Sequence, residues 1–367
     1  MYILLIAIDR ASKIATIPLV VFLTSGTETT LLLCQSVVLL CYALLSAGRD
    51  AVFTKRIFSN HKYFEIALSY RLRTLGILSP IICLYLYIAN PVEWFYYFII
   101  CIVTLFGGCF DIYESVLQAH GNHKRYLFKK IGITTCCSLV AYRWEPDLLM
   151  VAPYLYPILL AFKQKYIIRI NKILNLLKIY RGHFSKYFYA ALLNLSASKY
   201  ELVLGVLDGG TQNMIKNVAL ANRFADMISF AFSIVIIKNL KKINSESRDT
   251  RKKINRLMLA MLFFGVACFL TIFVTIEREL GVTQKILLGI TLGICYGSGG
   301  IISYIWASLN LPMVALKIGF LNAAMLLCIS VPLYFTSGFN AFILNIAATQ
   351  LALTFIPYLR FRKSWLS

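Results

Sequence analysis

Charged side chains interrupt two stretches of the sequence that are otherwise apolar, residues 2–24 and residues 187–237. A charge at the centre of a membrane helix costs about 2.5–3.5 kcal/mol even on lenient insertion scales, so such residues normally face a wet cavity or a partner. Most of these side chains are cations, and cations fixed in a wet cavity bind anions such as phosphate. We predict a cationic cavity for an anionic substrate, and its binding residues would be Arg10, Lys13, Lys199, Lys216 and Arg223.

The carboxylates in the same stretches have two interpretations. Asp9 and Lys13 are four residues apart, and Arg223 and Asp226 are three apart. Each pair therefore shares a helix face and can form an ion pair that only fixes helix packing. Pairing still leaves an excess of cations, which favours the cavity. We predict ion coupling or structural pairing for the carboxylates, which are Asp9, Glu201 and Asp226.

A second acidic pair, Asp111 and Glu114, ends another apolar run beside His120 and His123. We interpret it as an interfacial ion-pair site rather than a proton relay. All four histidines fall in predicted cytoplasmic segments, the ten cysteines show no zinc or disulfide spacing, and the chain has no Gly-rich phosphate loop of the Walker type. The sequence therefore predicts neither catalytic residues nor a metal or other cofactor.

Membrane helices are the elements that must position these residues. Hydrophobic residues make up 59% of the chain and charged residues 14%, with a mean hydropathy of +0.73. Long continuous apolar runs favour helices over a barrel, and the absence of a cleavable signal pattern predicts that the first helix is retained. We predict spans at about residues 2–24, 31–47, 69–89, 94–118, 126–142, 148–162, 187–207, 213–237, 257–276, 286–306, 313–335 and 339–358.

The distribution of Lys and Arg predicts how these spans are oriented. With the N-terminus inside, the predicted cytoplasmic segments hold 29 Lys and Arg residues, whereas the external connections hold 3. The positive-inside rule then gives an N-in, C-in topology. Because the basic segments are short and scattered between spans, we expect them to contact anionic membrane lipids rather than nucleic acid.

A short repeat predicts how the spans are grouped. Ala-Ser-Lys occurs at residues 11–13 in the first span and at residues 197–199 in the seventh. Both spans run in the same direction, which is typical of parallel repeats about an axis along the membrane normal. We predict an all-α integral membrane protein of about twelve helices with parallel pseudo-two-fold symmetry. It would consist of an N-terminal six-helix lobe (1–165), a basic cytoplasmic linker (166–186) and a C-terminal six-helix lobe (187–367).

Three segments carry a resemblance to a known family. They are SAGRDAVFTKR at residues 46–56, LQAHGN at 117–122 and NVALANRFAD at 217–226. With the twelve predicted spans, the chain resembles the Wzx-type polysaccharide (O-antigen) repeat-unit flippases of the multidrug/oligosaccharidyl-lipid/polysaccharide exporter superfamily. The resemblance implies translocation of undecaprenyl-diphosphate-linked oligosaccharides across the bacterial inner membrane by alternating access, for O-antigen or capsule-type polysaccharide synthesis in which lipopolysaccharide is one product. It also implies that either an ion gradient (H⁺ or Na⁺) or substrate-coupled antiport drives transport, with polysaccharide polymerase and chain-length proteins as partners.

The sequence leaves two alternative functions open. A multidrug-type exporter of the same superfamily would favour a more acidic and apolar cavity than the one predicted here. A membrane polysaccharide polymerase or ligase would normally need a sizeable external loop with Arg, His or Asp. The longest predicted external connection, residues 277–285, is too short for such a loop.

Overall fold

The described part of the chain is helical. A computed structural model describes residues 5–6, 8–9, 12–13, 28–45, 57, 62–90, 92–119, 121–163, 200–207, 218–219, 222, 281–283, 285–286 and 312–366. The chain divides into two compact units: unit 1 comprises Met1–Leu195 and Glu201–Ile215, and unit 2 comprises Ser196–Tyr200 and Lys216–Ser367. The predicted linker 166–186 lies outside the described residues.

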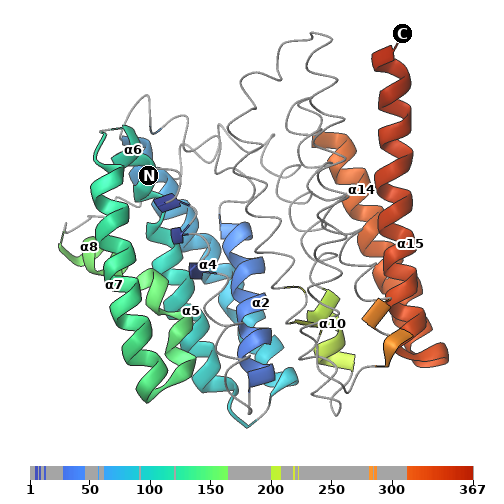
Figure 1. The fold of residues 1–367 in the computed structure, drawn as a ribbon, viewed down its shortest axis with the longest axis horizontal. Helices are drawn as coiled ribbons and strands as arrows, with labels where there is room; N and C mark the ends of the chain where they lie inside the picture. The colour runs from blue at the N-terminus through green and yellow to red at the C-terminus, as the bar shows by residue number, and fades with distance from the viewer. Residues whose placement is uncertain are drawn as a thin grey trace. The chain divides into compact units, whose positions relative to one another are not determined.

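Unit 1 is built around helix α5 (Trp94–Phe110), which contacts α2 (Glu28–Leu45), α4 (Lys62–Ala89) and α8 (Ala152–Lys163). Its other helices are α6 (Tyr113–Ala119), α7 (His123–Trp144) and the 3₁₀ turn η1 (Pro146–Met150). Helix α4 runs alongside α5 (Figure 1), and α7 packs on α8. Most of the C-terminal half of α5 is buried, so this helix forms the centre of the unit.

Two glycines let other helices approach α5 closely. A Cβ at Gly107 would lie 2.6 Å from the Cβ of Tyr154 on α8, and one at Gly108 would lie 2.8 Å from Cδ2 of Tyr42 on α2. Small residues at such positions allow backbones to pack tightly in membrane proteins. The Gly-Gly pair therefore brings two tyrosines against the end of α5.

The outer surface of unit 1 is apolar, as a lipid-facing surface requires. On α4 the side chains of Ile77, Ile81 and Leu84 are 69%, 60% and 61% exposed, and they recur at helical spacing. Among the described residues, Tyr63–Ala89 and Gly319–Thr349 are long and apolar enough to cross a bilayer. This pattern agrees with the predicted membrane helices.

Unit 2 is described mainly over α14 (Pro312–Met325), the π-helical turn η2 (Leu326–Ser330) and α15 (Val331–Leu366). Helix α15 contains two helical segments joined at Gly338, whose φ of 78° is in the left-handed region that favours glycine. The break coincides with the predicted boundary between the spans 313–335 and 339–358. Tyr200, the first residue of α10 (Tyr200–Leu207), also belongs to this unit.

The predicted spans of unit 1 match observed helices, with shifted ends. The span predicted at 31–47 is α2, 69–89 is α4, and 126–142 is α7. The span predicted at 94–118 is two helices, α5 and α6, and 148–162 comprises most of η1 and α8. Most of the spans predicted at 2–24, 187–207, 213–237, 257–276 and 286–306 lies outside the described residues.

Candidate functional site

The site begins at the junction between α5 and α6. Helix α5 ends at Phe110, and the Asp111 N–H donates to the carbonyl of Gly108 at 3.3 Å. The buried Arg71 guanidinium on α4 donates to the carbonyls of Gly108 (2.9 Å) and Cys109 (3.4 Å). A helix end leaves carbonyls without intrahelical partners, and Arg71 binds the Cys109 carbonyl there and adds a second hydrogen bond to that of Gly108. Asp111 is thereby fixed at a break in the protein interior.

Lys130 of α7 lies at the centre of the site. Its Nζ is 3.1 Å from Asp9 Oδ1, 3.3 Å from Asp111 Oδ1 and 2.5 Å from Glu114 Oε1. The Lys130 side chain is fully buried. The three carboxylates come from the N-terminal segment, the α5–α6 junction and α6, and we call them together the carboxylate cage (Asp9, Asp111 and Glu114).

Lys13 is joined to the same cage. Its ammonium forms an ion pair with Asp111 Oδ2, and the Tyr42 hydroxyl donates to that oxygen at 3.0 Å. The Lys13 Nζ also lies 5.7 Å from the ring centroid of Tyr42 and 5.2 Å from that of Tyr154, within range of cation–π attraction. Asp111 therefore bridges two lysines.

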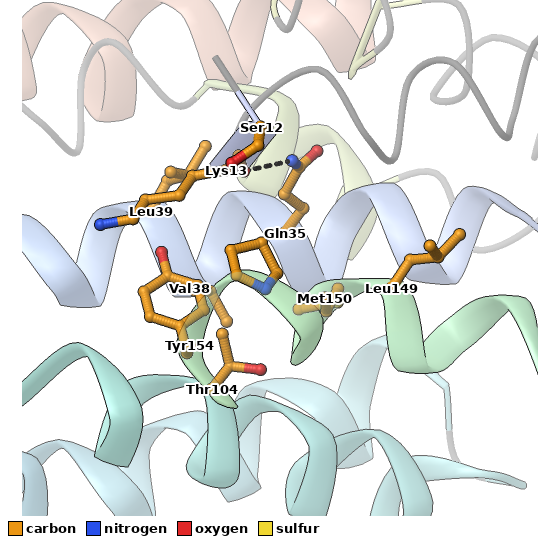
Figure 2. Close-up of a pocket in the computed structure, with 10 residues that line it drawn as sticks. Ser12, Lys13, Gln35, Val38, Leu39, Thr104, Leu149, Met150 and Tyr154 are labelled. Atoms are coloured by element: carbon orange, nitrogen blue, oxygen red, sulfur yellow. Dashed lines mark hydrogen bonds between the residues drawn. The ribbon is translucent and has the colours of Figure 1, made fainter. Parts of the chain in front are cut away.

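A narrow pocket lies beside Lys13, between the N-terminal segment, α2, α5 and the start of α8. The Gln35 amide donates to the backbone carbonyl of Lys13 at 3.3 Å, and Figure 2 shows Gln35 reaching toward Lys13 across the pocket. The lining mixes polar and apolar side chains: Ser12, Lys13, Gln35, Val38, Leu39, Thr104, Leu149, Met150, Pro153 and Tyr154. Lys13 thus borders a small pocket while its ammonium is paired with Asp111.

On its other side the cage continues along the inner face of α7. His123 Nε2 lies 3.8 Å from Glu114 Oε2, and the His123 ring stacks on Tyr126 with centroids 6.2 Å apart. His123, Tyr126, Lys130 and Thr134 are all buried and recur at helical spacing. This helix face is polar in the protein interior, which is costly unless it serves a purpose.

The connection between α7 and α8 gives a contrasting acidic group. Burial raises the pKa of Asp147, and the neighbouring Glu145 carboxylate raises it further, whereas a hydrogen bond from Tyr97 acts in the opposite direction. Asp147 accordingly accepts a proton more readily than an exposed aspartate. The carboxylate of Asp111, by comparison, is compensated by two lysines.

The structure places only some of the residues predicted from sequence. Asp9 and Lys13 are in the site, but Asp9 contacts Lys130 and Lys13 contacts Asp111. Glu201 is buried in unit 1 on α10, where the Tyr85 hydroxyl donates to the next carbonyl, that of Leu202, at 3.2 Å. The others lie outside the described residues: Arg10, Lys199, Lys216, Arg223 and Asp226.

Sequence reasoning missed Lys130 and underestimated Asp111 and Glu114. Lys130 is counted among the cytoplasmic Lys and Arg residues at the start of the span predicted at 126–142, yet its side chain is fully buried. A usable signal is present, because Tyr126, Lys130 and Thr134 are spaced four residues apart and lie on one helix face. Asp111 and Glu114 do form ion pairs, as predicted, but in a buried network.

No known protein-family model and no curated protein matches the sequence. Solved structures do match over nearly the whole chain. The eukaryotic MATE transporter AtDTX14 aligns with a TM-score of 0.62 at 12% identity, covering 98% of this chain and 93% of that one. The Vibrio cholerae MATE transporter VcmN, solved as a point mutant, aligns with a TM-score of 0.53 at 15% identity, covering 99% of this chain and 93% of that one.

The chain has the fold of the MATE transporters. That fold is an all-α membrane fold of about twelve helices in two lobes. It agrees with the predicted all-α membrane fold of about twelve helices in two lobes. The MATE fold is a multi-pass membrane fold, and in this chain the buried ion-pair network lies among the helices of unit 1.

Proposed function

We propose that the chain is a membrane exporter driven by an ion gradient, and that the ion-pair network of unit 1 belongs to its coupling machinery. The observation that carries the proposal is the burial of Lys130 among three carboxylates. Ionisable groups inside a membrane protein are expensive and mark ion or substrate pathways. The MATE-type fold supports export as the overall activity.

Charge balance supports ion coupling. Among the described residues of the network, the three carboxylates of the cage face two lysines, Lys13 and Lys130. An uncompensated buried charge costs several kcal/mol, so about one further positive charge is favourable there. A proton meets this need when it binds one carboxylate and leaves when the site opens to the other side.

One candidate substrate is an undecaprenyl-diphosphate-linked oligosaccharide. This proposal rests on the flippase resemblance of residues 46–56, 117–122 and 217–226, together with the cations Lys199, Lys216 and Arg223. Under this proposal the protein lies in the bacterial inner membrane with both termini in the cytoplasm. It would work with a polysaccharide polymerase and chain-length proteins. Lys13 adds little to a phosphate clamp while it is paired with Asp111, so the cations between residues 187 and 237 would supply most of it.

A second candidate is a multidrug-type exporter. Both similar structures are MATE transporters, and the described network holds more carboxylates than lysines. An excess of carboxylates suits cationic substrates, whereas a diphosphate needs an excess of cations. The two candidates share the coupling network and differ in what the remaining cavity binds.

The decisive experiment expresses the chain in two hosts, one lacking its flippase and one lacking its drug exporters. Restored surface polysaccharide supports the flippase, and restored efflux of a cationic dye supports the multidrug exporter. Asp111→Asn should abolish the restored activity at an unchanged membrane level, while the exposed Glu93→Gln should retain it. Full activity of Asp111→Asn would exclude the network from coupling, and failure in both hosts would contradict the proposed function.

A clamp for diphosphate makes a separate prediction for Arg223. Arginine offers two parallel donors to phosphate, whereas lysine offers a point charge. In the flippase-deficient host, Arg223→Lys should therefore reduce surface polysaccharide partly and Arg223→Ala severely. Normal polysaccharide in Lys13→Ala, Lys199→Ala and Arg223→Ala, at normal expression, would rule out the cationic clamp.

A further inference from the structure

We infer that the ammonium of Lys130 is a tethered cation: it occupies a carboxylate cage that would otherwise bind a hard monovalent cation such as Na⁺. Export by this chain would then require no Na⁺. The inference rests on the proposed function only in naming the class of coupling ion that the site excludes. The carboxylate cage itself is present in the structure whatever the chain transports.

The geometry of the cage matches the donors of a lysine. An ammonium has three N–H donors and no acceptor, and Lys130 Nζ meets one oxygen-bearing group for each donor. The distances are 3.1 Å to Asp9, 3.3 Å to Asp111 and 2.5 Å to Glu114. Every donor is used, so an inorganic cation has no place while the lysine is there.

The same oxygens are the ligands that hard cations prefer. Carboxylate, carbonyl and hydroxyl oxygens suit hard ions, whereas nitrogen and sulfur ligands suit transition metals. The three carboxylates come from separate segments of the chain, and the fold brings them together around Lys130 Nζ. Removing the ammonium alone would leave three carboxylates facing one point, of which Asp9 and Asp111 have side chains only 4% exposed.

A buried hydroxyl gives independent support. Tyr126 is 5% exposed, and its hydroxyl has no hydrogen-bond partner among the described residues. It lies within electrostatic range of Lys130 and of all three carboxylates, and Lys130 Nζ is 5.8 Å from its ring centroid. Tyr126 thus adds, near the cage, a buried polar oxygen that Lys130 does not bond and that a small cation or its water could use.

The neighbouring cations do not fill the same position. Lys13 is paired with the other oxygen of Asp111, Arg71 donates to the carbonyls at the end of α5, and His123 approaches the other oxygen of Glu114. Lys130 is therefore the described residue whose removal empties the centre of the cage. Its neutral replacement of similar length is Lys130→Met.

Thermal unfolding of the purified full-length protein in detergent tests the inference. The unfolding temperature is measured in NaCl, LiCl and choline chloride at equal ionic strength. The native protein should unfold at the same temperature in all three salts. Lys130→Met should be more stable in NaCl than in choline chloride by about 3 °C or more, since ligand binding to the folded state raises stability. Lys129→Met, at the exposed neighbouring position, should behave like the native protein.

If Lys130→Met cannot be purified, the double variant Lys130→Met/Glu114→Gln carries the same comparison, because it removes one charge of each sign. A native protein stabilised by Na⁺ relative to choline would overturn the inference, as would a Lys130 variant with no difference between the salts. Neither result depends on a transported substrate. A failure here therefore leaves the export test of Asp111→Asn unaffected, and the two proposals can fail separately.

Discussion

The described parts of the two units differ in the polar groups that they bury. In unit 1 the described core holds five charged side chains in one network, with Lys130 fully buried at its centre. In the described part of unit 2, two hydrogen bonds between side chains join neutral groups. The Tyr200 hydroxyl donates to Asn222 Oδ1 at 3.1 Å, and the Asn345 amide donates to Ser330 Oγ at 2.8 Å.

Stability does not explain this difference. Neutral hydrogen bonds between membrane helices are worth about 0.6 kcal/mol on average, so those of unit 2 are modest aids to packing. Replacing a buried ion pair by apolar groups of similar volume is often neutral or stabilising by about 1–4 kcal/mol. A network of buried charges therefore needs a reason other than stability, and the function proposed above would supply one in ion movement.

The largest effect that this comparison predicts is that of Asp111→Ala. Removing one member of a buried charge network costs about 3–5 kcal/mol, because Lys13 and Lys130 would lose a shared partner. Equilibrium unfolding in mixed detergent micelles would measure it. The exposed Glu93→Ala should stay within about 0.5 kcal/mol of the native protein. An equal, small cost for both variants would mean that water compensates the network and that the contrast between the units is not energetic.

The next effect concerns the packing that holds the network. A Cβ at Gly107 would lie 2.6 Å from the Cβ of Tyr154 and 3.0 Å from its carbonyl oxygen. Backbone cannot rotate away, so Gly107→Ala should cost about 1–3 kcal/mol and displace Tyr154 from Lys13. Gly132→Ala is the matched control, because no atom lies within 4 Å of its new Cβ. This control should be neutral or stabilising by up to about 1 kcal/mol.

Equilibrium unfolding measures the stability of both glycine variants, and an export assay measures whether the site still works. We expect Gly107→Ala to lose activity together with stability, since Tyr154 lines the pocket and lies over Lys13. If Gly107→Ala and Gly132→Ala behaved alike, the close approach of α8 to α5 would have to be wider than the structure shows.

Much of the fold could be predicted from the sequence. Runs of apolar residues locate helices, and turn residues such as Gly338 locate breaks, because both are local properties of the chain. Where a helix ends inside the protein was harder to predict. Nothing in the run of residues 94–118 requires a break at Asp111, which depends on Arg71 of α4 donating to the carbonyls at the end of α5.

The site was predicted less well, for a related reason. Asp9 and Lys13 are on one helix face, so local spacing suggests that they pair with each other. Their observed partners are Lys130 and Asp111, more than ninety residues away in the sequence. Spacing along one helix detects charges that face the interior but not which helix supplies the opposite charge.

The smallest predicted effect tests the neutral side of the comparison. Asn345→Leu removes the hydrogen bond to Ser330, which itself donates to the Met325 carbonyl in the π-helical turn at 3.4 Å. Because both groups are uncharged, the loss should be about 0.6–1 kcal/mol. A double-mutant cycle with Ser330→Ala should assign most of that cost to the pair, while the exposed Thr336→Ala should change stability little.

A cost for Asn345→Leu as large as that for Asp111→Ala would show that unit 2 depends on its buried polar contacts as strongly as unit 1 does. The energetic contrast between the units would then no longer support a functional role for the charged network.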